Sequence, residues 1–187
     1  MKQKVVLAFS GGLDTSFCVP YLIHEKGLEV HTAIVNTGGF SEEEAKRIEE
    51  RALQLGATTH TCIDAVEDYY QRGIRYLIFG NVLKNNTYPL SVSSERFFQA
   101  LNIVEHIKKT GADYVAHGST GAGNDQIRFD LVFEVLAPEV KILALFASSV
   151  CRDNRKSITY GKRDLIFRGK NRNTPSIRVC GVLVLAE

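Results

Sequence analysis

The chain has no marked excess of charge of either sign, no apolar run long enough to cross a membrane and no paired cysteines. Its 187 residues contain 23 Lys and Arg against 21 Asp and Glu, and this balance gives no reason to expect nucleic acid or a membrane surface as a partner. The longest apolar stretches, residues 142–147 and 182–186, are the size of strands. Four scattered cysteines without metal-ligand spacing predict reduced thiols, no protein-held metal and a cytoplasmic location; they are Cys18, Cys62, Cys151 and Cys180.

Apolar strands and helical segments alternate along the first two thirds of the sequence. Short apolar or β-branched runs predict strands at residues 4–9, 29–36, 58–63 and 113–117. The spacing of apolar residues predicts helices at 14–26 and 42–55, a helical stretch through Tyr70 and Leu77, and a helix at 93–109, with a turn at Asn85 and Asn86. Ser41, with Glu44 three residues later, is typical of a capping box, and Gly56 is expected to end that helix.

This alternation predicts an α/β fold with a doubly wound, mostly parallel sheet and helices on both faces. In such sheets a ligand binds beyond the carboxyl ends of the strands, where the strand order reverses. Two polar, glycine-rich segments follow predicted strands, at residues 10–16 and 118–125. We expect both to be loops at that edge of the sheet.

The first segment, Ser-Gly-Gly-Leu-Asp-Thr-Ser at residues 10–16, has the properties of a phosphate-binding loop. It stands between a strand and a helix, so consecutive backbone N–H groups and the positive end of a helix dipole meet there. Its glycines permit close backbone approach, and the hydroxyls of Ser10, Thr15 and Ser16 can donate to phosphate oxygens. The lysine of a Walker loop is absent, so the segment suits a departing pyrophosphate better than transfer of a terminal phosphoryl group.

The same segment resembles the signature of the PP-loop ATP pyrophosphatases, which form an adenylated intermediate. Within it, Asp14 is a candidate for the magnesium side of the site, and the alternative is a simple helix cap.

The second segment, residues 117–130, combines glycines with amide, carboxylate and guanidinium groups. Asp125 suits an ammonium group, Arg128 suits a carboxylate in bidentate contact, and Asn124 can both donate and accept hydrogen bonds. The segment therefore predicts a site for a zwitterion.

With this segment and the Tyr-Pro-Leu-Ser-Val-Ser stretch at residues 88–93, the chain resembles the argininosuccinate synthase family from about residue 4 to residue 142. The resemblance implies the PP-loop adenine nucleotide α-hydrolase (Rossmann-like) type of fold, and condensation of citrulline with aspartate through a citrullyl-adenylate, which releases AMP and pyrophosphate. It implies ATP binding by Ala8, Phe9, Ser10, Gly11, Gly12, Leu13, Asp14, Thr15, Ser16 and Gly118. It implies citrulline contacts from Tyr88, Ser93, Asn124 and Arg128, and aspartate contacts from Thr120, Asn124 and Asp125.

The resemblance also implies arginine biosynthesis, Mg²⁺ on the phosphates and a homo-oligomer, typically a tetramer. No side chain stands out as a general base, so catalysis is expected to come from positioning and charge stabilisation. Two alternatives stay open. Another adenylating PP-loop enzyme, such as a transfer-RNA thiolase or an amidotransferase synthetase, would share the first segment but lack the second. A non-catalytic module would bind ATP without exchanging pyrophosphate.

Residues 1–143 are expected to form the ATP-binding domain, and residues 144–187 a divergent tail in place of the family's synthetase domain. The basic stretch at 151–173 is interpreted as a poorly ordered tail in preference to a nucleic-acid-binding patch. A family-like Tyr-Ser-Ile-Asn-Lys-Gly-Leu-Trp segment, back-translated and read one base out of frame, gives the sequence from Thr174 onward. This predicts a slipped reading frame between Leu143 and Cys151, and a chain that by itself binds ATP weakly and makes no argininosuccinate.

Overall fold

The computed structural model describes residues 2–120 and 124–146. A five-stranded sheet runs through these residues in the order β3-β2-β1-β6-β7, and every neighbouring pair is parallel. The strands are β1 (Lys4–Ala8), β2 (Glu29–Asn36), β3 (Thr59–Asp64), β6 (Tyr114–Thr120) and β7 (Lys141–Phe146). The predicted parallel α/β architecture is confirmed.

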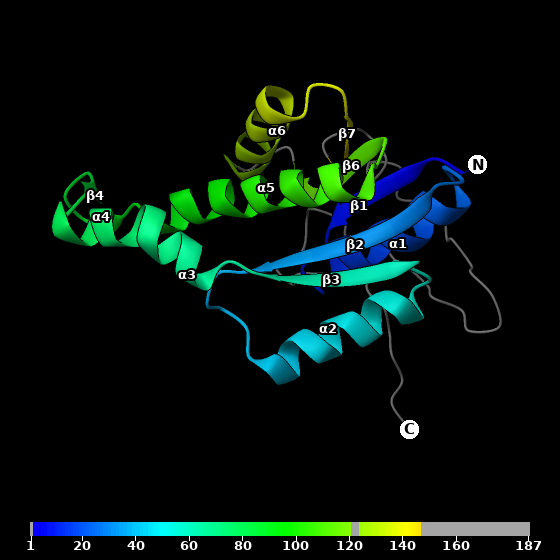
Figure 1. Cartoon of the computed structure of the whole chain (residues 1–187), viewed down its shortest axis with the longest axis horizontal. Coiled ribbons are helices and arrows are strands. Elements are labelled where there is room, and N and C mark those ends of the chain that lie inside the picture. Colours follow the sequence, from blue (N-terminus) through cyan, green and yellow to red (C-terminus); the bar gives the residue numbers. More distant parts are fainter. Residues whose placement is uncertain (1, 121–123, 147–187) are drawn as a thin grey trace, which may run out of the picture.

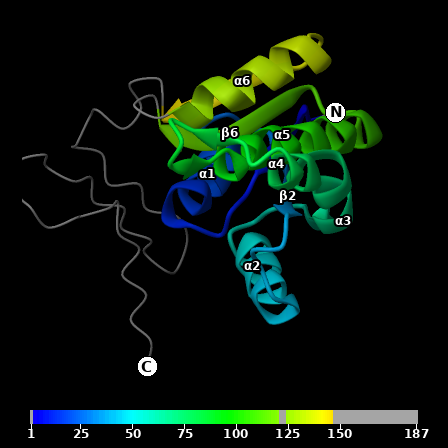
Figure 2. The ribbon, with the colours of Figure 1, turned by 90° about the vertical axis from the view of Figure 1, so that its left-hand side faces the viewer.

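Helices cover both faces of this sheet, as Figure 1 shows. The four long helices are α1 (Leu13–His24), α2 (Glu42–Gln54), α5 (Ser91–Thr110) and α6 (Asn124–Leu136). Side chains on β1 alternate between the faces, so Val5 and Leu7 pack in the core under α1 and α2, whereas Val6 packs in the core under α5 and α6. Figure 2 shows α6 and α2 at opposite sides of the domain. The domain is therefore a three-layer, doubly wound structure.

Local sequence signals account for the helix ends. At the start of α2, the Glu44 N–H donates to the Ser41 hydroxyl at 3.2 Å and the Ser41 N–H donates to the Glu44 carboxylate at 2.9 Å, which confirms the predicted capping box. The hydrogen bond from the Ser41 backbone, followed by that from its side chain, holds the pKa of the Glu44 carboxyl below its ordinary value. Helix α5 ends at Gly111, whose φ of 63° provides a left-handed cap.

A smaller unit connects β3 to α5. It comprises α3 (Val66–Tyr69), the π-helical turn η1 (Tyr70–Ile74), α4 (Arg75–Phe79) and a hairpin of β4 (Leu83–Lys84) and β5 (Tyr88–Pro89). Asn85 and Asn86 occupy the hairpin turn with φ of 54° and 56°, which confirms the predicted turn. Figure 1 shows α4 and the hairpin at the amino-terminal end of α5, away from the sheet.

The second glycine-rich segment is not the loop that we expected from residues 118–125. Strand β6 continues to Thr120, because its end pairs with β7 through Thr120 and Phe146, and α6 begins at Asn124. Neither α6 nor the sheet position of β7 was predicted. Glycine and polar residues dominate the local pattern, so the strand depends on pairing with a segment more than twenty residues away.

The chain forms β1, β2 and β3 toward one edge of the sheet and then β6 and β7 toward the other. The strand order therefore reverses between β1 and β6, and the loops after these two strands meet at one place. Within the described ranges, no helix is long and apolar enough to cross a membrane.

Candidate functional site

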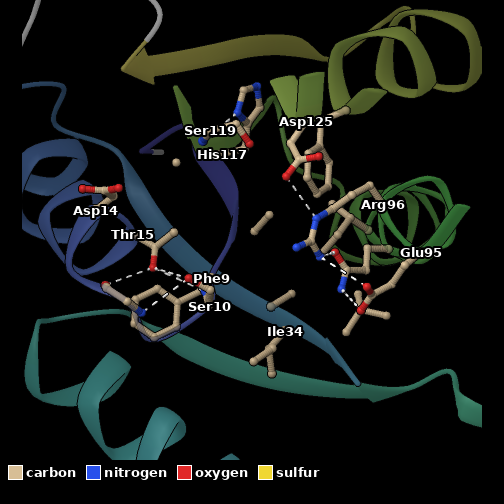
Figure 3. A pocket seen from close by; sticks show the side chains of 18 of the residues that line it. Phe9, Ser10, Asp14, Thr15, Ile34, Glu95, Arg96, His117, Ser119 and Asp125 are labelled. Carbon is tan, nitrogen blue, oxygen red and sulfur yellow. Dashed lines mark hydrogen bonds and ion pairs between the residues drawn. The ribbon is translucent and has the colours of Figure 1, made fainter. Parts of the chain in front are cut away.

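A cavity of about 480 Å³ opens at this reversal point, beyond the carboxyl ends of β1, β2 and β6. One wall is the segment from β1 into α1, and the opposite wall consists of side chains from α5 and α6, as Figure 3 shows. From the predicted site, the cavity is lined by Ala8, Phe9, Ser10, Gly12, Leu13, Asp14, Thr15, Gly118 and Asp125. The structure therefore brings the two predicted segments to one site.

The loop after β1 holds its own hydroxyl groups in place. The Ser10 and Thr15 hydroxyls are 3.1 Å apart, the Ser10 N–H donates to the Thr15 hydroxyl at 3.3 Å, and Thr15 donates to the Gly12 carbonyl at 3.3 Å. Gly12 is the N-cap of α1, and no side chain caps the helix there. The first N–H groups of α1 thus remain available to an anion, which the helix dipole also favours.

The two glycines of this loop have different tasks. Gly11 has a φ of +72°, and a Cβ on it would lie 2.9 Å from Cγ1 of Ile48 in α2, so only glycine fits there. Gly12 has an ordinary φ of −71°, and a Cβ on it would meet only the Ser10 hydroxyl, at 3.3 Å. Gly12 lines the cavity and Gly11 does not. Gly11 therefore shapes the loop, and Gly12 keeps the cavity open.

Ser16, a predicted ATP-binding residue, is fully buried and is not part of the cavity wall. Its hydroxyl accepts a hydrogen bond from Nε of Arg51 at 2.9 Å. This bond joins α1 to α2 behind the loop, so Ser16 stabilises the packing of the two helices and does not face the cavity.

Gly118 marks the place where the two segments touch. A Cβ on Gly118 would lie 2.8 Å from Cγ2 of Thr15, closer than real Cβ atoms approach. The residue before it, His117, is buried beside the cavity, and its Nδ1 accepts a hydrogen bond from the Ser119 N–H at 3.3 Å. The Nε2 of His117 then carries the proton and donates to Oδ1 of Asp130 at 2.9 Å. These contacts fix the end of β6 against α6 and against the phosphate-binding loop.

The residues predicted to hold an amino acid are partly brought together. Arg128 donates from Nη1 to Oδ1 of Asp125 at 2.7 Å and from Nη2 to the Ser93 hydroxyl at 3.2 Å. Of these three, Asp125 lines the cavity. Asn124 is exposed at the start of α6, and Thr120 is the last residue of β6. Tyr88 lies on the hairpin, half exposed, away from the cavity wall.

Sequence reasoning missed a polar network on α5. Arg96 donates from Nε to Oδ2 of Asp125 at 3.3 Å and from Nη1 to Gln99 at 2.8 Å. Glu95 accepts hydrogen bonds from the Thr37 hydroxyl at 2.7 Å and from Gln99 at 3.2 Å. Figure 3 shows Glu95, Arg96 and Asp125 facing Ser10, Asp14 and Thr15 across the cavity. The available signal was the placement of Glu95, Arg96 and Gln99 near the start of a helix whose amino end points to the sheet's carboxyl edge.

Asp14 lies in the first turn of α1 and lines the cavity, but it does not cap the helix, because Gly12 is the N-cap. Partial removal from water raises the pKa of the Asp14 carboxyl. The described residues contain no group of three or more His, Cys, Asp or Glu side chains that could hold a metal ion. A divalent cation here would therefore need most of its oxygen ligands from a bound substrate.

Comparison with known proteins shows the family of the chain that carries this site. The family model described as the arginosuccinate synthase N-terminal HUP domain matches residues 4–166. Argininosuccinate synthase from Synechocystis sp. is 44% identical over 162 residues, which cover 86% of this chain and 40% of that protein. Argininosuccinate synthase from Saccharolobus solfataricus is 46% identical over 142 residues, which cover 76% of this chain and 36% of that protein. The chain therefore spans well under half the length of these relatives.

Among solved structures, the predicted subunit of tRNA methyltransferase from Methanocaldococcus jannaschii is similar with a TM-score of 0.51. The match covers 78% of this chain and 69% of that one at 17% sequence identity, and at that identity it supports the fold alone.

Proposed function

The chain belongs to the argininosuccinate synthase family through its N-terminal HUP domain, and on that premise we propose that it binds ATP and supplies the adenylating part of argininosuccinate synthesis. In the proposed reaction, ATP, citrulline and aspartate give argininosuccinate, AMP and pyrophosphate through a citrullyl-adenylate. The observation that carries the proposal is the uncapped amino end of α1, which opens into a cavity where the two family segments meet.

The proposed role of the first loop is to hold the β- and γ-phosphates of ATP and then the pyrophosphate. The N–H groups of the first turn of α1 and the hydroxyls of Ser10 and Thr15 are the donors. No lysine stands in the loop to follow a terminal phosphoryl group during transfer. Attack at the α-phosphorus leaves both outer phosphates on the donors that already hold them, so the loop stabilises the leaving group.

The adenosine of ATP fits the apolar part of the cavity. Ala33, Ile34, Val35 and Phe40 line the cavity where β2 ends. Gly118 allows the end of β6 to approach α1 closely, and this closeness brings the α-phosphate side of the nucleotide next to the second segment. Gly118 is therefore proposed as a residue of the ATP site alongside Ala8, Phe9, Gly12 and Leu13.

The second segment is proposed to hold the amino acids. Citrulline is assigned to Tyr88, Ser93, Asn124 and Arg128, and aspartate to Thr120, Asn124 and Asp125. The support is the set of contacts among Arg128, Ser93 and Asp125 at the cavity edge, which orients a guanidinium and a carboxylate beside each other. Arg128 offers a cation to the carboxylate of citrulline, and Asp125 offers an anion to the ammonium group of aspartate.

The chemical contribution of the chain is proposed to be positioning. The ureido oxygen of citrulline has to lie in line with the α-phosphorus, and the aspartate amine then attacks the ureido carbon and displaces AMP. Asp14 is proposed to face a Mg²⁺ ion carried by the phosphates, and that cation would neutralise part of their charge. The raised pKa of Asp14 would return toward its ordinary value with a cation beside it.

We further propose a cytoplasmic location, a homo-oligomeric assembly and a role in arginine biosynthesis. The boundary at residue 143 also remains a prediction, and the family match extends past it to residue 166. The predicted frame slip and the tail it would produce lie outside the described residues, apart from residues 144–146 at the end of β7.

Competition between ATP and pyrophosphate tests the proposed function. We expect each to bind the purified chain in calorimetry, and a saturating amount of one to weaken the other, because both use the donors at the start of α1. Arg47→Gln, an exposed change on the outer side of α2, serves as the control and should bind both normally. ATP binding that pyrophosphate does not affect would contradict the assignment of the loop.

A further inference from the structure

We propose that Arg96 binds a carboxylate of the aspartate substrate, and that it does so by exchanging Asp125 for that carboxylate when the substrate's ammonium group arrives. This inference rests on the proposed function, because it assigns a further residue to the aspartate part of the same site.

The charged residues described at the cavity wall include a single arginine. Among the described residues that line the cavity, Arg96 is the one Lys or Arg, whereas Asp14, Glu95 and Asp125 are carboxylates. Aspartate brings two carboxylates and one ammonium group, so it needs a cation as well as an anion to be held. Arg128 is assigned to citrulline and does not line the cavity, which leaves Arg96 as the available cation for aspartate.

Asp125 holds its two arginine partners at unequal distances. Its Oδ1 accepts the short 2.7 Å bond from Arg128, whereas its Oδ2 accepts a longer one, at 3.3 Å, from Nε of Arg96. The shorter bond orients the carboxylate. The longer bond is the weaker of the two and the easier to replace, and the ammonium group of aspartate can take that oxygen while Arg128 stays in place.

The remaining bonds of Arg96 show how it would be held after the exchange. Nη1 donates to Gln99 at 2.8 Å and lies 3.9 Å from Glu95, while no described residue accepts a hydrogen bond from Nη2. Glu95 is held in turn by the Thr37 hydroxyl at 2.7 Å. The guanidinium therefore keeps its anchor on α5 and still has Nε and Nη2, on one edge of the fork, to offer a carboxylate.

The exchange conserves charge. In the free chain, Asp125 faces both Arg96 and Arg128. With aspartate bound, the ammonium group takes the place of Arg96 at Asp125, and a carboxylate of the substrate pairs with Arg96. Arg96 and Asp125 are partly exposed, and each keeps an opposite charge beside it at both stages. A ligand without the ammonium group, such as succinate, cannot release Arg96 in this way.

The experiment is a titration of the ATP-loaded chain with L-aspartate, followed by the ¹H–¹⁵N signals of the arginine Nε–H groups. The Arg96 signal is identified by its loss in Arg96→Gln. We expect it to shift on addition of aspartate and to stay in place with succinate at the same concentration. The titration itself is recorded on the unmodified chain, and the variant serves only to identify the Arg96 signal.

Affinities from the same titrations give the second readout. Arg96→Gln should weaken aspartate binding about tenfold or more, as expected for loss of a hydrogen bond between charged groups, while ATP binding remains close to that of the unmodified chain. Arg96→Lys keeps the charge but loses the planar guanidinium, so its aspartate affinity should lie between those of the unmodified chain and Arg96→Gln. Arg47→Gln on α2 is the matched control and should leave aspartate binding unchanged.

The outcomes separate the two proposals. If aspartate does not shift the Arg96 signal of the ATP-loaded chain, the assignment of Arg96 is wrong and the proposed ATP site is unaffected. The same holds if Arg96→Gln binds aspartate with normal affinity. An equal loss of ATP and aspartate binding in Arg96→Gln also overturns that assignment, because the residue would then only support the cavity wall. A chain that binds no ATP overturns the proposed function itself.

Discussion

Gly118 and Thr15 touch so closely that a single added carbon would not fit between them. A Cβ on Gly118 would lie 2.8 Å from Cγ2 of Thr15 and 3.5 Å from its backbone nitrogen. Thr15 cannot turn away freely, because its hydroxyl bonds to Ser10 and Gly12. This contact fixes the distance between the end of β6 and the start of α1, and thus the two walls of the proposed ATP site.

Gly118→Ala should therefore push the two walls apart. We expect it to lower the free energy of unfolding by about 1–3 kcal/mol, the usual cost of overpacking, and to weaken ATP binding. Thr15→Ser removes Cγ2 and keeps the hydroxyl, so the double variant Gly118→Ala with Thr15→Ser should recover most of the ATP affinity. Denaturant unfolding and calorimetry on the four chains measure both effects. A double variant as weak as Gly118→Ala alone would show that the Cγ2 contact is not the cause.

Gly12 and Gly11 should respond oppositely to substitution. Gly12→Val should fold normally, because its φ of −71° suits any residue, and it should lose at least about tenfold in ATP affinity because the side chain enters the cavity. Gly11→Ala should instead lower the free energy of unfolding by about 1–2 kcal/mol or more, since φ is +72° and Ile48 lies in the way. Thermal unfolding and ATP calorimetry on both variants make the comparison. Normal ATP binding by a folded Gly12→Val chain would show that the loop is not part of the ATP site.

Arg128→Lys tests the citrulline assignment in the setting of a full-length relative. Lysine keeps the charge but cannot bridge Asp125 and Ser93 as the planar guanidinium does. Citrulline binding should weaken about tenfold or more, whereas ATP binding should change little. Separate Michaelis constants for the two substrates provide the measurement. Equal losses for both would contradict the role given to Arg128.

The capping box of α2 predicts a pH dependence of stability. The Ser41 N–H and hydroxyl lower the pKa of Glu44 in the folded chain, so ionised Glu44 stabilises the fold above its ordinary pKa of about 4.5. That contribution is lost as the pH falls through the lowered folded-state pKa. Glu44→Gln should therefore be less stable than the unmodified chain at pH 7, and the difference should shrink toward pH 3 in urea unfolding. Glu43→Gln is the control, because Glu43 makes no hydrogen bond to Ser41. A stability difference between Glu44→Gln and the unmodified chain that stayed constant with pH would refute the explanation.

The sequence alone predicted those features that depend on neighbouring residues. The strand at Lys4–Ala8, the capping box of Ser41 and Glu44, and the turn at Asn85 and Asn86 are all local, and the structure confirms them. The parallel direction of the strands followed from the alternation of strands and helices. The meeting of the two glycine-rich segments followed from the rule that parallel strands end at one edge.

Features that depend on distant contacts were not predictable in the same way. The extension of β6 to Thr120 requires β7, and the burial of Ser16 requires Arg51 on another helix. Gly11 and Gly12 look equivalent in sequence, yet Ile48 decides which of them shapes the fold. Arg96 was missed because a single arginine on a helix resembles a surface residue until α6 places Asp125 beside it.

The most direct test of the account is a map of ATP binding on the chain itself, by ¹H–¹⁵N chemical shifts of the backbone amides. We expect ATP to shift the amides of Gly12, Leu13, Asp14 and Thr15 together with those of Gly118 and Ser119, and pyrophosphate to shift the first group more than the second. The method detects weak binding, so a low affinity does not prevent the measurement. Shifts confined to other parts of the fold, or none at millimolar ATP, would contradict the claim that this chain carries the ATP site of the family.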